Sequence, residues 1–512
     1  MRLVPAALTG WLVTAVGISW PVGGIAAVLC ALLGAASGVL WWQAGRLRRP
    51  GWRLAGATLA AAAVVGVGFG CAVALRTDAV ARHPITAAFG TVAPVTVTPS
   101  ESALTAGARR LMFRATLQGL GDSDASGRVV VFASAADFGE VVVGEPVRFR
   151  ARITRPARRD LTVATLTAAG RPTRGRAGPL QRAAHLIRAR FVVAAGRVLP
   201  GEQARMLPAL VLGDTSAVTA ATGREFRAAG LTHLMAVSGA NVTIVCGTVL
   251  FSARLVGPRA AAVLAGIALV AFVVVVQPTA SVLRAAVMGA IALLGVLSAR
   301  RRQAIPSLSG SVLVLLAIAP HLAVDVGFAL SVVATAALVV VAPVWSARLV
   351  SRGWPKPLAD AVCVAWAAHL VTAPLIAGIS GQVSLVSAAA NLAVAVLIAP
   401  ITVLGSVAAV LCGWWPAGAQ FPIRFTGPEL WWVCRIAHWA GTVPGATVGV
   451  PAGAIGVVGV GTAAVLAVLG WRWRWWRLAV AAMLLCLVAW SVAGALTGQA
   501  ARLSAGRDTI VE

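Results

Sequence analysis

The sequence predicts a polytopic α-helical membrane protein with a small β-barrel (OB-like) domain inserted on its extracytoplasmic side. Hydrophobic residues make up 59% of the 512 positions, charged residues only 12%, and the mean hydropathy is +0.87. A soluble chain cannot bury that much apolar surface. Apolar runs of about 20 residues, the length that a membrane-spanning helix needs, recur along most of the chain. One intervening segment alternates apolar and polar residues instead, which predicts strands.

Three apolar runs open the chain and predict its first membrane helices: Val4–Trp20, Val22–Trp42 and Leu54–Leu75. The loop between the second and third runs is rich in arginine (Gln43–Arg53). Short basic loops remain in the cytoplasm. The third helix is therefore expected to lead out of the cytoplasm, and the following segment up to about Leu231 to lie outside.

Five short alternating runs follow, separated by Gly, Asp and Ser turns: Val92–Thr98, Arg110–Gln118, Arg128–Phe132, Val141–Arg152 and Leu161–Leu166. Five such strands suit a small barrel, for which the OB fold is the natural candidate. OB surfaces bind single-stranded nucleic acid through a basic groove and stacking aromatic rings. Aromatic residues are few here, and a small barrel needs several for its core, so DNA contact stays open. The DNA-contact candidates are Arg109, Arg110, Arg114, Arg148, Arg150 and Arg152.

A basic connector leads from this segment to a second membrane block. Its amphipathic stretch Leu180–Val198 predicts a helix that lies in the outer headgroup layer or lines a basic vestibule. The apolar runs of the second block are Leu234–Val256, Ala260–Val276, Ala280–Leu297, Leu308–Ala319, Leu322–Val344, Ala359–Ile379, Val386–Leu411, Leu430–Thr442, Ala452–Leu469 and Leu478–Leu496.

Polar residues in or beside these runs are the candidate functional residues, because an unpaired polar group in hydrocarbon is costly. The stretch Val211–Val242 ends in a cluster of small and polar side chains at the edge of an apolar run. Arg284 either pairs with Asp325 across helices or faces a hydrated path and meets phosphates. The candidates for lining or supporting such a path are Asp214, His233, Ser238, Asn241, Arg284, Asp325 and Asn391.

Two further interpretations depend on helix geometry. Pro374 and Pro400, on either side of Asn391, predict helix breaks, which are common beside substrate paths. His233 and Ser238 are residue types of a serine hydrolase, but five helical residues turn two side chains about 140° apart. The GxSxG nucleophile pattern is also absent. We therefore predict no catalytic residues and no enzyme.

The residue patterns limit the other chemistries. The histidines and cysteines are scattered, and neither a metal-ligand spacing nor a GxxxxGK[ST] nucleotide loop is present. We therefore predict no metal and no cofactor. The net charge of +27 comes from 43 basic and 16 acidic residues. Part of this excess follows from membrane topology, and part suits a polyanionic partner.

Four sequence blocks resemble the ComEC family of competence proteins, the inner-membrane channels that admit single-stranded DNA during natural transformation. Together they cover roughly Leu207 to Pro400, and the first is the most specific. They are GD at Gly213–Asp214 followed by FRAAGLTHLMAVSGANV, SVLRAAVM at Ser281–Met288, DVGFALS at Asp325–Ser331, and GQVSLVSAAANLAVAVLIAP at Gly381–Pro400. The resemblance implies pore or pore-support roles for the seven candidate residues.

The resemblance also implies a location and partners. We expect a multi-pass protein of the cell (plasma) membrane that meets single-stranded DNA and membrane lipid. An outer DNA receptor of the helix-hairpin-helix type and a separate motor or nuclease are further implied partners, and homo-oligomerisation stays open. Many family members carry a C-terminal metallo-β-lactamase-like domain, for which this sequence has no motif, so a short form is expected.

These observations divide the chain into five expected parts. They are N-terminal transmembrane helices (1–76), an extracytoplasmic OB-like domain (77–176), an amphipathic basic connector (177–231), a competence-type transmembrane channel domain (232–497) and a C-terminal tail (498–512). Two rival functions stay open: a transporter or flippase for another anionic solute or envelope precursor, and an intramembrane enzyme that uses Ser238 or His233.

Overall fold

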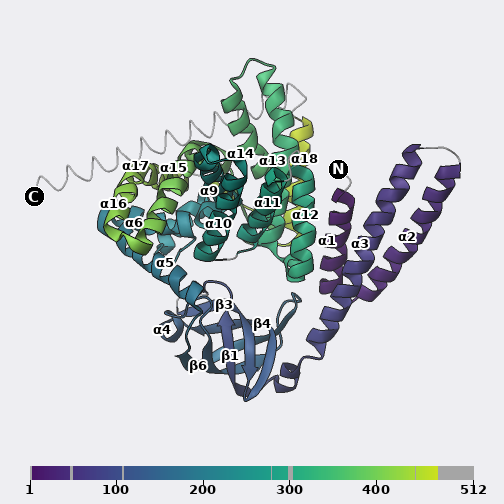
Figure 1. Ribbon diagram of the computed structural model, residues 1–512, viewed down its shortest axis with the longest axis horizontal. Helices are drawn as coiled ribbons and strands as arrows, with labels where there is room; N and C mark the ends of the chain where they lie inside the picture. The colour runs from purple at the N-terminus through teal and green to yellow at the C-terminus, as the bar shows by residue number, and fades with distance from the viewer. Residues whose placement is uncertain are drawn as a thin grey trace, which may run out of the picture. The chain divides into compact units, whose positions relative to one another are not determined.

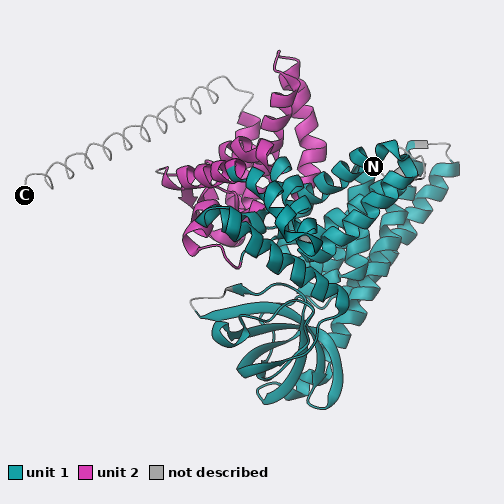
Figure 2. Cartoon of the chain, turned by 60° about the vertical axis from the view of Figure 1, so that its left-hand side comes forward, with its two compact units in different colours: residues 1–215, 236–332, 399–427 teal, residues 216–235, 333–398, 428–512 magenta. Residues whose placement is uncertain are grey.

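The computed structural model describes residues 3–46, 50–105, 109–277, 279–297, 304–443 and 445–470. The chain forms two compact units (Figure 2). The first combines residues 1–215, 236–332 and 399–427, and the second combines residues 216–235, 333–398 and the described residues from 428 onward. The predicted run Leu478–Leu496 and the tail 498–512 lie outside the described residues.

The described part of the chain is mostly helical, as the composition predicts (Figure 1). Among the described residues, six helices are long and apolar enough to cross a membrane: α2 (Gly23–Arg46), α3 (Pro50–Ala81), α10 (Pro258–Val276), α13 (Val326–Val350), α14 (Lys356–Ser380) and α15 (Ser387–Trp414). Shorter apolar helices are α1 (Leu3–Ser19), α9 (Gly239–Ser252), α11 (Ala280–Leu297), α12 (Ala304–Ile318) and α18 (Ala454–Gly470). The predicted polytopic helical architecture is therefore present.

The prediction of one continuous span over Leu234–Val256 is wrong. The chain forms a short helix α8 (Thr232–Met235), leaves helical geometry, and enters α9 only at Gly239. Ser238 stands before α9 in extended backbone, with φ −93° and ψ 162°. The helical spacing argument for His233 and Ser238 therefore does not apply, because no continuous helix joins them.

The predicted helix breaks at Pro374 and Pro400 are also wrong. Pro374 lies inside α14 and Pro400 inside α15, and both helices continue through these positions. Apolar membrane helices tolerate proline where neighbouring groups satisfy the one freed carbonyl. Pro320, in contrast, begins the 3₁₀ helix η3 (Pro320–Val324), so the span predicted from Leu322 starts later, at Val326.

The strands form a small closed barrel in the first unit. They are β1 (Val92–Pro99), β2 (Leu104–Thr105), β3 (Arg110–Leu120), β4 (Ser123–Ser134), β5 (Val147–Thr154) and β6 (Thr162–Arg174). The sheet order is β1-β5-β6-β4-β3, and β1 also pairs with β3, which closes a ring of five strands with β2 attached to β3. β4 and β6 pair in parallel, and the other pairs are antiparallel. The prediction of a five-stranded barrel is confirmed.

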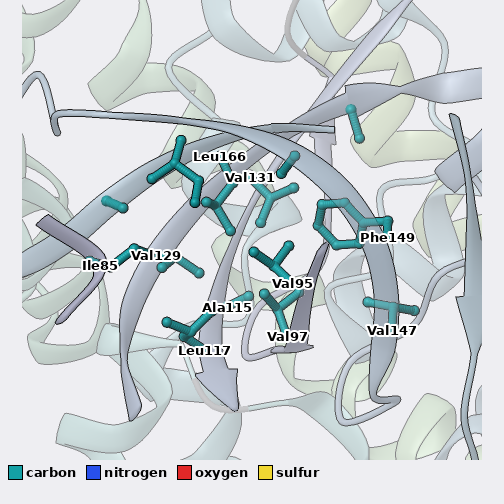
Figure 3. Packing of buried hydrophobic residues seen from close by; sticks show 14 of the residues in the cluster. Ile85, Val95, Val97, Ala115, Leu117, Val129, Val131, Val147, Phe149 and Leu166 are labelled. Carbon is teal, nitrogen blue, oxygen red and sulfur yellow. The ribbon is translucent and has the colours of Figure 1, made fainter. Parts of the chain in front are cut away.

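The barrel interior is filled by one face of each strand. Leu117, Val131 and Leu166 are fully buried there, and Figure 3 shows Val131 beside Leu166 and Leu117 beside Ala115. The short helix α4 (Ala135–Phe138) adds Phe138, whose ring packs edge-on against that of Phe149, with 5.1 Å between the ring centroids. Phe113, Phe138 and Phe149 are therefore buried in the core of the barrel, as the small size of the domain predicts.

Three helices form the connector: α5 (Pro179–Val198), α6 (Gly201–Leu212) and α7 (Ala220–Ala228). α5 is amphipathic as predicted, but its buried face includes the charged residue Arg188, which is only 8% exposed. The helix therefore packs into the first unit on one side, which a helix lying only in a headgroup layer would not do. The remaining elements are η1 (Pro84–Ala88), η2 (Ala253–Leu255), α16 (Pro416–Phe425), α17 (Gly427–Thr442), β7 (Gln382–Ser384) and β8 (Thr447–Gly449).

Candidate functional site

A buried arginine without an acidic partner is the central feature of the helical core. Arg284 lies on α11 and is 5% exposed. Its Nε donates to Ser331 Oγ at 2.8 Å, and its Nη1 lies 3.1 Å from Met288 Sδ. Both acceptors are neutral. No carboxylate among the described residues pairs with this guanidinium, so none of them compensates its charge.

The predicted alternative of an Arg284–Asp325 ion pair is wrong. Asp325 Oδ1 instead accepts a hydrogen bond from the Phe328 amide at 2.8 Å, and Asp325 Oδ2 lies 3.7 Å from Arg114 Nη2 on the barrel. An aspartate directly before α13 satisfies a free amide of the first helical turn and interacts favourably with the helix dipole. This local role fixes the carboxylate away from Arg284.

The N-terminus of α9 adjoins the Arg284 guanidinium. Nη2 of Arg284 lies 3.0 Å from the position that a Cβ would occupy on Gly239, the first residue of α9. Ser238 does not cap this helix, because its hydroxyl instead donates to Asn241 Oδ1 at 3.3 Å. A helix N-terminus carries partial positive charge. Two positive groups therefore meet here, and the acceptors that the described residues offer them are neutral, which is an environment suited to an anion.

Gly239 leaves the room that Arg284 occupies, which gives a testable prediction. We expect Gly239→Val to displace the guanidinium, because the added methyl groups would overlap its Nη2 and the nearby Ala285 Cβ, 3.3 Å from the same position. The variant should still reach the membrane, but the activity that depends on Arg284 should fall about tenfold or more. Gly247→Val is the matched control, because a Cβ at Gly247 meets nothing within 4 Å. Equal activities of the two variants would contradict the prediction.

Asp214, Ser238 and Asn241 support the chain around this site. Asn241 Nδ2 donates to the carbonyl of Leu210 at 3.0 Å. Asp214 Oδ2 lies 3.4 Å from Arg188 Nη2. Arg188 Nη1 also donates to the carbonyls of Leu212 (2.9 Å) and Val275 (3.1 Å), at the ends of α6 and α10. These contacts hold helix ends together, so the three predicted residues have positions that support the structure.

The other two predicted residues lie in the second unit. Asn391 Nδ2 donates to Ser387 O at 2.9 Å, one turn earlier on α15, so its amide is satisfied within its own helix. His233 lies on α8 with an exposed side chain. Its ring hydrogen-bonds to the backbone at Gly230.

A polar junction between the barrel and the helices was not predicted from the sequence. Arg114 lies 3.1 Å from Glu101 Oε2 in addition to its contact with Asp325. Ser102 Oγ donates to Gln277 Oε1 at 2.6 Å. Gln277 ends α10 with a positive φ of 76°. No sequence signal marks the contacts that join the barrel to the helices, because Ser102 and Gln277 lie 175 positions apart and Arg114 and Asp325 lie 211 apart. Arg114 is therefore engaged within the protein.

His321 in η3 belongs to the same junction and predicts a pH effect. Burial, as the largest cause, and the nearby cations Arg128 and Arg114 together lower its pKa to about 3. The unfolded chain, with an ordinary pKa of about 6.5, binds more protons between these values, so stability is lost as pH falls below about 6.5. We expect the thermal unfolding midpoint of the purified chain to fall from pH 7 to pH 5. His321→Asn should reduce this fall, and an unchanged pH profile in the variant would contradict it.

The remaining predicted DNA-contact residues are all exposed, but they do not form one group. Arg148, Arg150 and Arg152 alternate with buried residues and so share the outer face of β5. Arg109 and Arg110 lie at the start of β3. Arg148 has an acidic neighbour, Asp122, at 3.8 Å, and both side chains are largely exposed. The structure therefore provides a basic stripe along β5 and a separate basic pair.

The comparison with known proteins agrees with the sequence blocks. A family model described as "Competence protein" matches residues 210–477, more than half of the chain. Neither a curated protein nor a solved structure matches the chain. The matched range contains Arg284, Ser331, Asp325 and the N-terminus of α9. A membrane protein with this helical content and this match belongs to the ComEC-like competence protein family.

Proposed function

We propose that this chain forms a channel in the cell membrane that conducts single-stranded DNA inward during natural transformation. The family and the apolar helices support a competence-related membrane protein. The observation that carries the finer proposal is the buried Arg284, which meets the α9 N-terminus without a carboxylate partner. A DNA strand presents one phosphate anion per nucleotide, and a guanidinium binds a phosphate through paired hydrogen bonds.

The electrostatics of the site suit a transient contact. A carboxylate beside Arg284 would compete with each arriving phosphate, and none of the described carboxylates occupies that position. Conduction requires binding that is favourable enough for entry and weak enough for release. One cation supported by a serine hydroxyl and a thioether meets both conditions better than a cluster of arginines would.

The barrel supplies a second element of the proposal. We propose that it is an OB-like domain on the extracytoplasmic side and that Arg148, Arg150 and Arg152 contact DNA phosphates there. Because Phe113, Phe138 and Phe149 are buried in its core, base stacking contributes little. The contact would then be electrostatic, independent of base sequence and weakened by salt. An outer DNA receptor and a separate motor or nuclease complete the proposed pathway.

The test measures DNA on each side of the membrane in a strain that lacks this chain. Labelled duplex DNA is added, and label that resists external nuclease is counted as internalised. We expect surface binding to persist and internalised label to disappear until the intact gene is restored. Normal internalisation together with an envelope defect would contradict the proposal and favour a transporter or flippase for another anion.

A further inference from the structure

A groove on the first unit lies between α5 and α16, separate from the Arg284 site. It has a volume of about 270 Å³. Arg190, Arg197 and Gln420 provide its polar groups, and Ala189, Val193 and Pro416 contribute apolar walls. No acidic residue lines it. The groove is therefore cationic and apolar at once, which neither the family nor the proposed channel explains.

The helices hold the two arginines in a fixed arrangement. Arg190 and Arg197 are seven residues apart on α5, so about two helical turns place them on one face. Phe191 and Ala195, which point away from this face, are buried. Arg190 Nη1 donates to the carbonyl of Gly413 at 2.8 Å, at the end of α15, which fixes α5 against that helix. Within the part of the chain that the structure describes, neither arginine forms an ion pair.

Four exposed aromatic residues lie close in the sequence to the groove residues Pro416 and Gln420. Trp414 and Phe421 are 74% and 71% exposed, and Trp415 and Phe425 are more than half exposed. Trp414 ends α15, Trp415 directly precedes α16, and Phe421 and Phe425 lie on α16, the helix that contributes Pro416 and Gln420. Exposed tryptophan in membrane proteins gathers at the headgroup level of the bilayer. A ligand here would meet cations with one end and apolar rings with the other.

We propose that this groove binds an anionic phospholipid, with the lipid phosphate between Arg190 and Arg197 and the acyl chains against the exposed aromatic side chains. Basic pockets between membrane helices bind anionic headgroups through such charge complementarity. Gln420 donates a further hydrogen bond to the headgroup. A DNA strand shares the phosphate chemistry but lacks the apolar part that the rim accommodates, so the occupant is lipid. This assignment does not depend on the proposed channel function.

The test measures lipid retention by the purified full-length chain. The protein is placed in mixed micelles that contain phosphatidylglycerol and phosphatidylcholine, and bound lipid is counted by native mass spectrometry. We expect preferential retention of phosphatidylglycerol. Arg197→Gln should weaken its binding about fivefold, the effect of one basic residue at a membrane surface, and Arg197→Lys should restore most of it. Arg197 is exposed, so the fold should be unchanged.

Arg182→Gln is the matched control, because Arg182 is an exposed arginine on the same helix outside the groove. We expect this variant to retain phosphatidylglycerol like the unchanged protein, and a single-stranded oligonucleotide to leave the bound lipid in place. Unchanged lipid binding by Arg197→Gln would overturn the proposal. Equal losses in both variants, or displacement of the lipid by the oligonucleotide, would overturn it as well.

Discussion

Replacing Arg284 by glutamine is expected to lower the transformation frequency about tenfold to a hundredfold while the protein remains in the membrane. A hydrogen bond to a charged group contributes about 1.5–3 kcal/mol, and each 1.4 kcal/mol corresponds to a factor of ten. Glutamine retains a donor for Ser331 but removes the guanidinium charge, for which no described residue supplies a substitute. The measurement is the frequency of transformants per cell in a strain whose single copy carries the substitution.

Two companion variants separate charge from position. Arg284→Lys keeps the charge but not the planar pair of donors, so an intermediate frequency is expected. Arg259→Gln removes an exposed arginine in the first turn of α10 and should leave the frequency unchanged. If Arg284→Gln transforms as well as the unchanged strain at equal membrane abundance, the phosphate contact proposed for Arg284 is wrong.

Replacing Arg188 by methionine is expected to destabilise the first unit by about 3–5 kcal/mol, the cost of leaving a buried ion pair with one partner. The substitution removes the guanidinium that joins Asp214 to the carbonyls of Leu212 and Val275. These three acceptors lie at the end of α6 and the end of α10, so the substitution removes the contacts that join the two helix ends. The measurement is the midpoint of thermal unfolding in detergent, together with the abundance of the protein in membranes.

The double variant Arg188→Met with Asp214→Asn distinguishes an unpaired charge from lost packing. We expect it to recover part of the stability, because asparagine leaves no uncompensated negative charge. Arg182→Met, an exposed change on the same helix, should shift the midpoint little. A midpoint for Arg188→Met equal to that of Arg182→Met would show that the buried contacts contribute little to stability.

Local patterns predicted the elements of this fold well. The alternation in Arg110–Gln118 identified β3, which runs from Arg110 to Leu120. The run Val141–Arg152 began its strand six residues early, because Gly144, with a φ of 79°, turns the chain before Val147. Apolar runs likewise located the long helices, whose ends depend on local turns such as the one at Gly381, which ends α14 with a φ of 64°, rather than on hydropathy.

The partners of the charged residues could not be predicted in the same way. The polarity of Arg284 and Asp325 marked both as unusual, but the structure pairs Asp325 with Arg114, which lies 211 positions earlier in the chain. Spacing along one helix carries no information about a contact with a separate domain. The amphipathic pattern of Leu180–Val198 likewise does not predict the burial of Arg188, which hydrogen bonds to the ends of α6 and α10 make possible.

The pairing of β1 with β3 that closes the barrel restricts how the domain recognises anything. An open sheet exposes a row of unpaired amides and carbonyls, to which an extended peptide or a second copy adds as an extra strand. In the closed ring each of the five strands already has two neighbours. Extra-strand addition is thus barred at the ring, and recognition by this domain depends on outward side chains rather than on its amide backbone.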